Sequence, residues 1–129
     1  MKKLLALLAL PLLAACATVS GASESLVGSK WTFTAIDGGA PQSPRAAVEF
    51  LPNRISATAG CNGLGGNYTV KGNQLITGPI VSTMMYCNGL MDQERALAAL
   101  LEAKPTYTLS GDRLVLQGGG HRAELSRAR

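Results

Sequence analysis

Residues 47–77 read AVEFLPNRISATAGCNGLGGNYTVKGNQLIT, and this stretch carries the strongest signals for the fold. Four short runs in it alternate apolar and polar side chains, at residues 47–51, 54–58, 67–70 and 74–77. Pro52-Asn53 joins the first two runs and Lys71-Gly72-Asn73 joins the last two, and both segments have the composition of tight turns. Alternation around such turns predicts two hairpins of antiparallel strands.

A glycine-rich segment, GCNGLGG at residues 60–66, separates the two hairpins. It lacks the Lys-Ser/Thr pair of a phosphate-binding P-loop and lies between expected strands. We therefore interpret it as a structural loop, in which glycines such as Gly60 and Gly66 permit positive φ where the chain bends. Asn62 is expected to hold the bend through its side-chain amide.

Further strands are expected on both sides of this stretch. Before it, residues 31–36 alternate so that Trp31 and Phe33 share one face. After it, four runs have a strand-like composition, at residues 80–84, 107–109, 113–116 and 122–125.

The period changes between residues 90 and 103, where Gly and Pro are absent and Ala, Leu and Glu are frequent. We expect a helix here, with Asn88 as its N-cap and Lys104-Pro105 at its end. Asp92 and Glu94 are two residues apart and should point to different sides of this helix.

These elements indicate an α+β protein. The expected architecture is a small antiparallel β-sheet or open barrel of about eight short strands, with one helix packed on it. The 129 residues are enough for one such domain, and no internal repeat with a fixed period is visible.

The N-terminus has the composition of a bacterial secretory signal. Lys2 and Lys3 precede an apolar run of about ten residues, too short to span a membrane. Residues 13–16, Leu-Ala-Ala-Cys, look like a lipobox, which predicts a signal peptide over residues 1–15 and lipidation of Cys16. The alternative is an ordinary signal peptide with a chance cysteine beside its cleavage site.

The small and polar residues 16–27 are expected to form a tether, and residues 28–129 the domain, with folding starting near Leu26 or Gly28. Ala17 rather than Asp after the cysteine favours the outer membrane, with the domain facing the periplasm. Loss of the signal would leave ten basic and eight acidic residues, a formal charge of +2. This charge, without a basic run, does not argue for nucleic acid as a partner.

Two cysteines, Cys61 and Cys87, then remain for the domain. An even pair in an exported chain favours a disulfide, and the alternative is a pair of buried free thiols. Closing this loop would contribute about 3–4 kcal/mol in the chain-entropy model. Two cysteines without a second His or Cys nearby cannot complete a zinc site, so we expect no metal and no cofactor.

Taken in order, several segments of the chain, between about residues 28 and 127, resemble the META/HslJ domain family. They are Trp31 to Gly38, Gly60-Cys61-Asn62 with Gly66 and Tyr68, Ser82-Thr83-Met84 with Cys87, Glu94 before the Leu-rich helix, and Asp112 to Leu114. The chain departs from the family at Met84 and Tyr86, where an arginine-like and a small residue are frequent. The resemblance implies a β-rich fold with one helix in envelope proteins, often lipoproteins, linked to heat shock, motility and drug resistance. It carries over no catalytic residues.

Two groups of side chains invite a functional interpretation. His121, the single histidine, could serve Ser82, Ser110 or Ser126 as a base. We instead interpret His121 as a solvent-facing turn residue, because no nucleophile-elbow motif surrounds these serines.

Met84, Met85, Tyr86 and Met91 form a soft apolar cluster near the helix start. We favour core packing beside the disulfide for this cluster; the alternatives are an adaptable binding surface or a soft-sulfur Cu(I) site.

The function expected from these observations is that of a monomeric, non-enzymatic binding or assembly module of the cell envelope. Its partner would be an envelope protein, a peptide or a lipid-like ligand, and the N-terminal lipid would hold it to the membrane. The alternatives are a structural, stress-protective lipoprotein without a ligand pocket, and an unrecognised hydrolase. An apolar cleft of about 300 Å³ would favour the first, and His121 bonded to a serine and a carboxylate would favour the last.

Overall fold

The computed structural model of the chain describes residues 25–129. The expected signal peptide over residues 1–15 and the expected lipid site at Cys16 lie outside the described residues. Within residues 25–129, no helix is long and apolar enough to cross a membrane.

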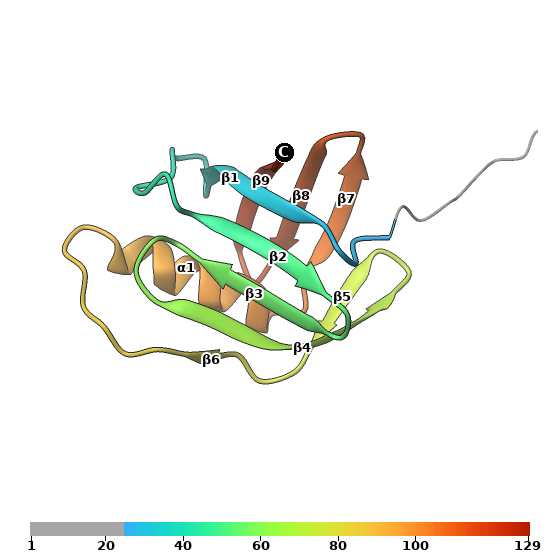
Figure 1. Cartoon of the computed structure of the whole chain (residues 1–129), viewed down its shortest axis with the longest axis horizontal. Coiled ribbons are helices and arrows are strands. Elements are labelled where there is room, and N and C mark those ends of the chain that lie inside the picture. The colour runs from blue at the N-terminus through green and yellow to red at the C-terminus, as the bar shows by residue number, and fades with distance from the viewer. Residues whose placement is uncertain (1–24) are drawn as a thin grey trace, which may run out of the picture.

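One helix and nine strands make up the described part of the chain (Figure 1). The strands are β1 (Lys30–Ile36), β2 (Ala47–Leu51), β3 (Arg54–Thr58), β4 (Gly63–Lys71), β5 (Gln74–Thr77), β6 (Val81–Ser82), β7 (Thr106–Ser110), β8 (Arg113–Gly118) and β9 (His121–Arg127). The helix α1 (Met91–Glu102) lies between β6 and β7.

Eight of the strands close into an antiparallel barrel. They are hydrogen-bonded in the order β3-β2-β1-β9-β8-β7-β5-β4, and β4 pairs back onto β3 from Arg54↔Asn67 to Thr58↔Gly63. The strand β6 adds to the outer side of this barrel by pairing with β4. The predicted α+β class is correct in broad terms. The barrel, however, is closed rather than open, and the single helix is a small part of the domain.

The closure depends on residues that we expected in a loop. Gly63 to Gly66 belong to β4, and their backbones supply most of the register with β3. Of the four glycines in residues 60–66, Gly60 alone adopts positive φ, at 116°. The interpretation of the whole segment as a bend was therefore wrong, because glycine also serves where backbones approach closely within a sheet.

The barrel interior is filled by large apolar side chains from alternate strand residues. Trp31, Phe50 and Ile55 are fully buried, and Phe33 lies on the same face as Trp31, as predicted. The helix adds Leu97, Leu100 and Leu101 to this core and packs against β1, β8 and β9. Leu26 is only 2% exposed, so the folded unit already includes this residue of the expected tether.

The start of α1 differs from the prediction. Leu90 is the N-cap residue and makes no side-chain capping hydrogen bond, so the expected cap at Asn88 was wrong. The backbone N–H of Leu90 instead donates to the carbonyl oxygen of Cys87 at 3.2 Å, which forms a turn that contains Asn88. The described chain enters at one end of the barrel, and the segment between β6 and α1 projects at the opposite end (Figure 1).

Candidate functional site on the loop before the helix

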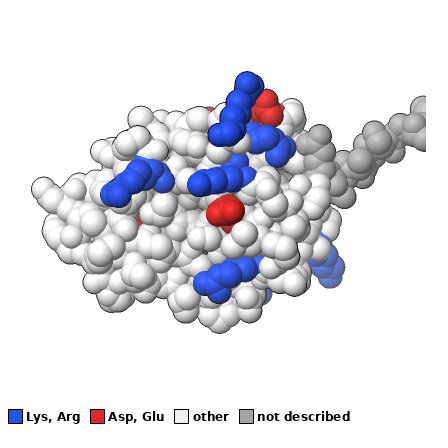
Figure 2. Space-filling view, in the orientation of Figure 1, with Lys and Arg blue, Asp and Glu red and all other residues white. Residues whose placement is uncertain are grey.

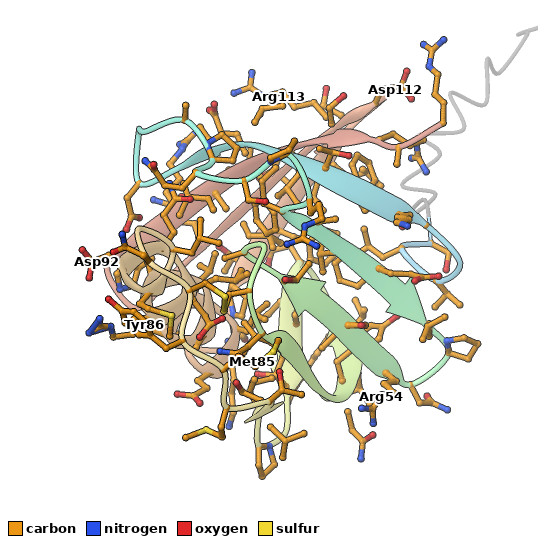
Figure 3. The ribbon with its side chains drawn as sticks, turned by 60° about the vertical axis from the view of Figure 1, so that its left-hand side comes forward. Arg54, Met85, Tyr86, Asp92, Asp112 and Arg113 are labelled. Atoms are coloured by element: carbon orange, nitrogen blue, oxygen red, sulfur yellow. A yellow bond between two sulfur atoms is a disulfide. The ribbon has the colours of Figure 1, made fainter. Side chains whose placement is uncertain are left out.

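Large apolar side chains are exposed on the segment that leads from β6 into α1, which we call the apolar edge (residues 81–86). The exposed fractions are 62% for Val81, 94% for Met84, 57% for Met85 and 79% for Tyr86. Figure 3 shows Tyr86 near Asp92, and both Met85 and Tyr86 lie on the side away from Asp112 and Arg113. Core packing was the wrong interpretation for these side chains. Met91, in the first turn of α1, is half-buried.

No charged residue occurs between Lys71 and Asp92 in the sequence, so the apolar edge has none of its own. In Figure 2 the strip along the lower left of the molecule, where β6 runs in Figure 1, is free of Lys, Arg, Asp and Glu. Contiguous exposed apolar side chains of this kind mark interaction sites more often than scattered ones do.

Asn62 holds this edge from beneath. The residue is 2% exposed, and its Oδ1 accepts from the backbone N–H of Met85 at 2.7 Å and from the Thr83 hydroxyl at 2.9 Å. Its Nδ2 donates to the carbonyl oxygen of Met85 at 2.9 Å. We expected the Asn62 amide to hold the glycine-rich bend, and in the structure it binds the apolar edge.

Glu94 completes the network from α1. Its Oε1 accepts from the backbone N–H of Asn62 and its Oε2 accepts from Asn62 Nδ2, both at 2.8 Å. The side chain is 7% exposed, whereas Asp92 two residues earlier is fully exposed, as the helical spacing predicted. Because both Glu94 oxygens bind Asn62, the amide orientation is determined and the helix is coupled to the edge.

The Cys61–Cys87 disulfide fixes the same region covalently. The two Cα atoms are 5.9 Å apart and the bond spans 26 residues. Next to it, the Arg45 guanidinium donates to the carbonyl oxygen of Gly60 at 2.9 Å. The apolar edge is therefore held by a covalent bond and by a buried polar network, and its exposed side chains project from a rigid base.

Comparison with known proteins identifies the family. The model of the META domain matches residues 24–129. The chain belongs to the META domain family. No curated protein matches it.

Two solved structures share the fold of this META domain. One, an NMR structure of a protein, aligns with a TM-score of 0.69 at 17% sequence identity, over 78% of this chain and 90% of the other. The second, an NMR structure of a protein from Burkholderia xenovorans, aligns with a TM-score of 0.62 at 20% identity, over 80% and 83% of the two chains. At these identities the likeness establishes the fold alone.

His121 lies at the start of β9 in this META domain, across the hairpin from Gly118. Its Nδ1 is 2.7 Å from Asp37 Oδ2, and this hydrogen bond is the main cause that lowers the pKa of the Asp37 carboxyl. The backbone N–H of Arg122 also donates to Asp37. Within residues 25–129 the imidazole bonds to this carboxylate and to none of Ser82, Ser110 and Ser126.

A separate cleft of about 300 Å³ lies where the described chain enters the META domain. Leu26, Val27, Val70 and Tyr107 contribute to its walls, and Tyr68 lies at its base. The Tyr68 hydroxyl is buried without a hydrogen-bond partner in the described part of the chain, and burial raises its pKa. The cleft reaches the size of small ligand sites, but another depression of about 370 Å³ lies beside β6, so volume does not single it out.

Metal chemistry has no obvious place in the described residues. Within residues 25–129, no group of three or more His, Cys, Asp or Glu side chains could hold a metal ion. Of the three methionines near the helix start, Met84 and Met85 are exposed and Met91 lies on α1.

Sequence reasoning missed three contributors to the site, which are Thr83, Val81 and the pairing of Glu94 with Asn62. The Thr83 hydroxyl accepts from the N–H of Gly63 at 3.1 Å and donates to Asn62 Oδ1, so it links β4 to the buried amide. The partner of Glu94 lies 32 residues away in the sequence. The available signal was one acidic residue among apolar residues on the inner face of the helix, where a carboxylate needs buried donors.

Proposed function

We propose that this protein is a non-enzymatic binding or assembly module of the bacterial envelope, anchored through lipid on Cys16, whose apolar edge contacts a partner protein. The observation that carries the proposal is the exposure of Met84, Met85 and Tyr86 on a base held by the disulfide and by Asn62. A rigid loop with protruding apolar side chains costs little conformational entropy when it binds. Methionine and tyrosine are also enriched at protein interfaces.

The position of the edge favours a protein over the anchoring membrane. The described chain enters the barrel at the end opposite to the segment before α1 (Figure 1). A lipid attached through the N-terminal segment would place the entry end nearest the membrane. The lack of Lys and Arg between residues 72 and 91 also removes the attraction to anionic headgroups that supports surface binding.

Photo-crosslinking in intact cells tests this contact. A photoreactive phenylalanine analogue at position 86 should give a discrete protein adduct, and the same analogue at the exposed Thr108 on β7 should not. Adding Met84→Ser and Met85→Ser should abolish the adduct while the protein level stays unchanged. Identical adducts from positions 86 and 108, or an adduct indifferent to both substitutions, would reject the apolar edge as the contact.

The anchor has its own test, because it is independent of the contact. The intact mass of the protein from a membrane fraction should begin at Cys16 with added acyl chains. Alkylation before and after reduction should label Cys61 and Cys87 after reduction only. An unlipidated mass would remove the envelope anchor from the proposal and leave the binding contact to be judged on the crosslinks. Under this proposal, any role in heat shock or drug resistance comes from the bound partner protein and not from catalysis by this chain.

A further inference from the structure

The strand β6 leaves a free edge outside the barrel in the described part of the chain. Each of the eight barrel strands has a neighbour on both sides, although β5 and β7 pair only at Gln74↔Thr106. Among residues 25–129, β6 pairs with β4 on one side and with no strand on the other. Since edge strands present unpaired N–H and C=O groups, β6 is where another strand can add to this sheet.

The register determines which backbone groups of β6 point outward. The N–H of Thr83 donates to the carbonyl oxygen of Gly63 at 3.2 Å, and Leu64 lies opposite Ser82. In an antiparallel ladder, hydrogen-bonded and non-bonded pairs alternate. The pair Leu64↔Ser82 is therefore non-bonded, and the N–H and C=O of Ser82 point away from β4.

Asn62 extends this ladder beyond the two residues of β6. Its side-chain amide accepts from the N–H of Met85 at 2.7 Å and donates to the C=O of Met85 at 2.9 Å, as the peptide group of a neighbouring strand would. Thr83 and Met85 thus both bond inward. The backbone groups of Met84 between them face outward, as those of Ser82 do.

The edge carries no charge of its own, although β6 is only two residues long and Arg54 of β3 lies beside it. Lysine and other charges on an edge discourage pairing with other chains, and no charged residue lies between residues 72 and 91. Pro79 comes before the paired residues and leaves the outward N–H groups of Ser82 and Met84 available. The flanking side chains of Val81 and Tyr86 are apolar and more than half exposed.

We infer that the backbone from Ser82 to Tyr86, within the apolar edge, binds an extended segment of a partner polypeptide as an additional β-strand. The partner would bond to the outward groups of Ser82 and Met84 and would present uncharged, alternately apolar side chains to Val81, Met84 and Tyr86. This inference rests on the proposed function and specifies its mode of contact. A peptide strand fits better than a second copy of the chain, because a five-residue edge buries far less than the roughly 800 Å² per partner of a stable dimer.

Proline at position 82 tests the backbone contact. The N–H of Ser82 is unused within the fold, so Ser82→Pro should keep the pairing with β4 while it removes the outward donor. The matched control, Ser82→Ala, removes the same hydroxyl, whose hydrogen bond goes to the carbonyl oxygen of Thr83, and keeps the N–H. Circular dichroism and an intact Cys61–Cys87 bond would verify that both variants fold.

The probe is a fluorescein-labelled peptide of about eight residues in which valine and threonine alternate, with a lysine at each end for solubility. Its anisotropy would be titrated with the full chain purified from membranes in detergent. We expect saturable binding that weakens at least about tenfold with Ser82→Pro and stays within about twofold with Ser82→Ala. The same peptide N-methylated at alternate residues should not bind, because it cannot form the ladder.

Three results would overturn the inference. They are no binding of the probe to the wild-type chain at about 2 mM, equal binding by Ser82→Pro and wild type, and self-association of the chain that Ser82→Pro abolishes. The last result would assign the edge to a second copy. If the crosslink from position 86 persists in Ser82→Pro but is lost when Met84 and Met85 become serine, the proposed contact stands and strand addition fails.

Discussion

Glu94 shows how one buried residue can determine the shape of a surface. Its two carboxylate oxygens are saturated by the backbone N–H and the side-chain amide of Asn62, and that amide in turn binds the backbone of Met85. A buried ionised group is tolerated when it is fully hydrogen-bonded, and it is costly to disturb. Changing the carboxylate should therefore loosen the apolar edge as well as the helix.

The substitution Glu94→Gln tests this coupling. Glutamine offers one oxygen for two donors, so its NH₂ group must face either the N–H of Asn62 or the Nδ2 of Asn62. We expect the free energy of unfolding to fall by about 2 kcal/mol, measured by urea denaturation with the disulfide intact. Glu102→Gln on the exposed face of the same helix is the control and should change stability by less than about 0.5 kcal/mol. Equal effects of the two substitutions would contradict a special role for Glu94.

Asp37, in the turn that follows β1, makes stability depend on pH. Hydrogen bonds from His121 and from the N–H of Arg122 lower the pKa of its carboxyl below the ordinary value of 3.8. A carboxyl with a lowered pKa in the folded state stabilises the protein above its unfolded pKa, and this contribution is lost as the pH falls through the folded pKa. Because Asp37 is substantially exposed, the contribution should be about 0.5 kcal/mol.

The variant Asp37→Asn isolates this contribution. Asparagine tolerates the positive φ of 50° at this position and keeps an acceptor for the N–H of Arg122. The stability difference between wild type and variant should be present at neutral pH and should shrink as the pH falls below 3.8 and through the lowered pKa of Asp37 in the folded state. A difference that stays constant from neutral pH to acid would mean that the charge of Asp37 contributes nothing.

At the scale of elements, local patterns predicted most strands because alternation and turn composition are local properties. The strands β2, β3 and β5 begin and end where the sequence predicted. The prediction failed at β4, where Gly63 to Gly66 have no alternating apolar pattern but pair with β3 on one side and β6 on the other. Closure of the barrel requires this pairing, and glycines carry no apolar side chains whose alternation could have predicted it.

Gly66 should be the residue on which the placement of β6 depends most. A Cβ atom there would lie 2.7 Å from the carbonyl oxygen of Pro79. Gly66→Ala should therefore push the Pro79 segment away from β4 and lower the free energy of unfolding by about 1–3 kcal/mol. The control is Gly63→Ala in the same strand, where a Cβ meets nothing within 4 Å and φ is not positive. Urea denaturation of both variants would decide, and equal losses would show that the contact with Pro79 is not responsible.

The candidate site was partly predictable at this scale. The sequence identified Met84, Met85 and Tyr86 as an apolar cluster near the helix start. We expected their side chains to be buried, because large apolar residues usually pack inward. They are exposed because the inward places along this segment are taken by the backbone of Met85 and the hydroxyl of Thr83, which bond to Asn62. Such a polar network inside an apolar segment cannot be read from composition.

At the scale of the whole molecule, two kinds of constraint meet at one end of the barrel. The disulfide ties β4 to the segment before α1, and the Asn62–Glu94 network ties the same two parts to the helix. Either constraint alone would position the apolar edge. Both together restrict it to one conformation, which favours binding because less entropy is lost on association.

This redundancy gives a prediction about removing the disulfide. Replacing Cys61 and Cys87 by alanine removes the restraint on a loop of 26 residues, which the chain-entropy model values at about 3.5 kcal/mol of unfolding free energy. Because Glu94→Gln loosens the same segment, the combined variant should lose less stability than the sum of the separate losses, by about 0.5–1 kcal/mol. A double-mutant cycle from urea denaturation measures this coupling. Strict additivity would mean that the disulfide and the network hold separate parts of the molecule, and the rigidity of the apolar edge would then have to come from the disulfide or the network alone.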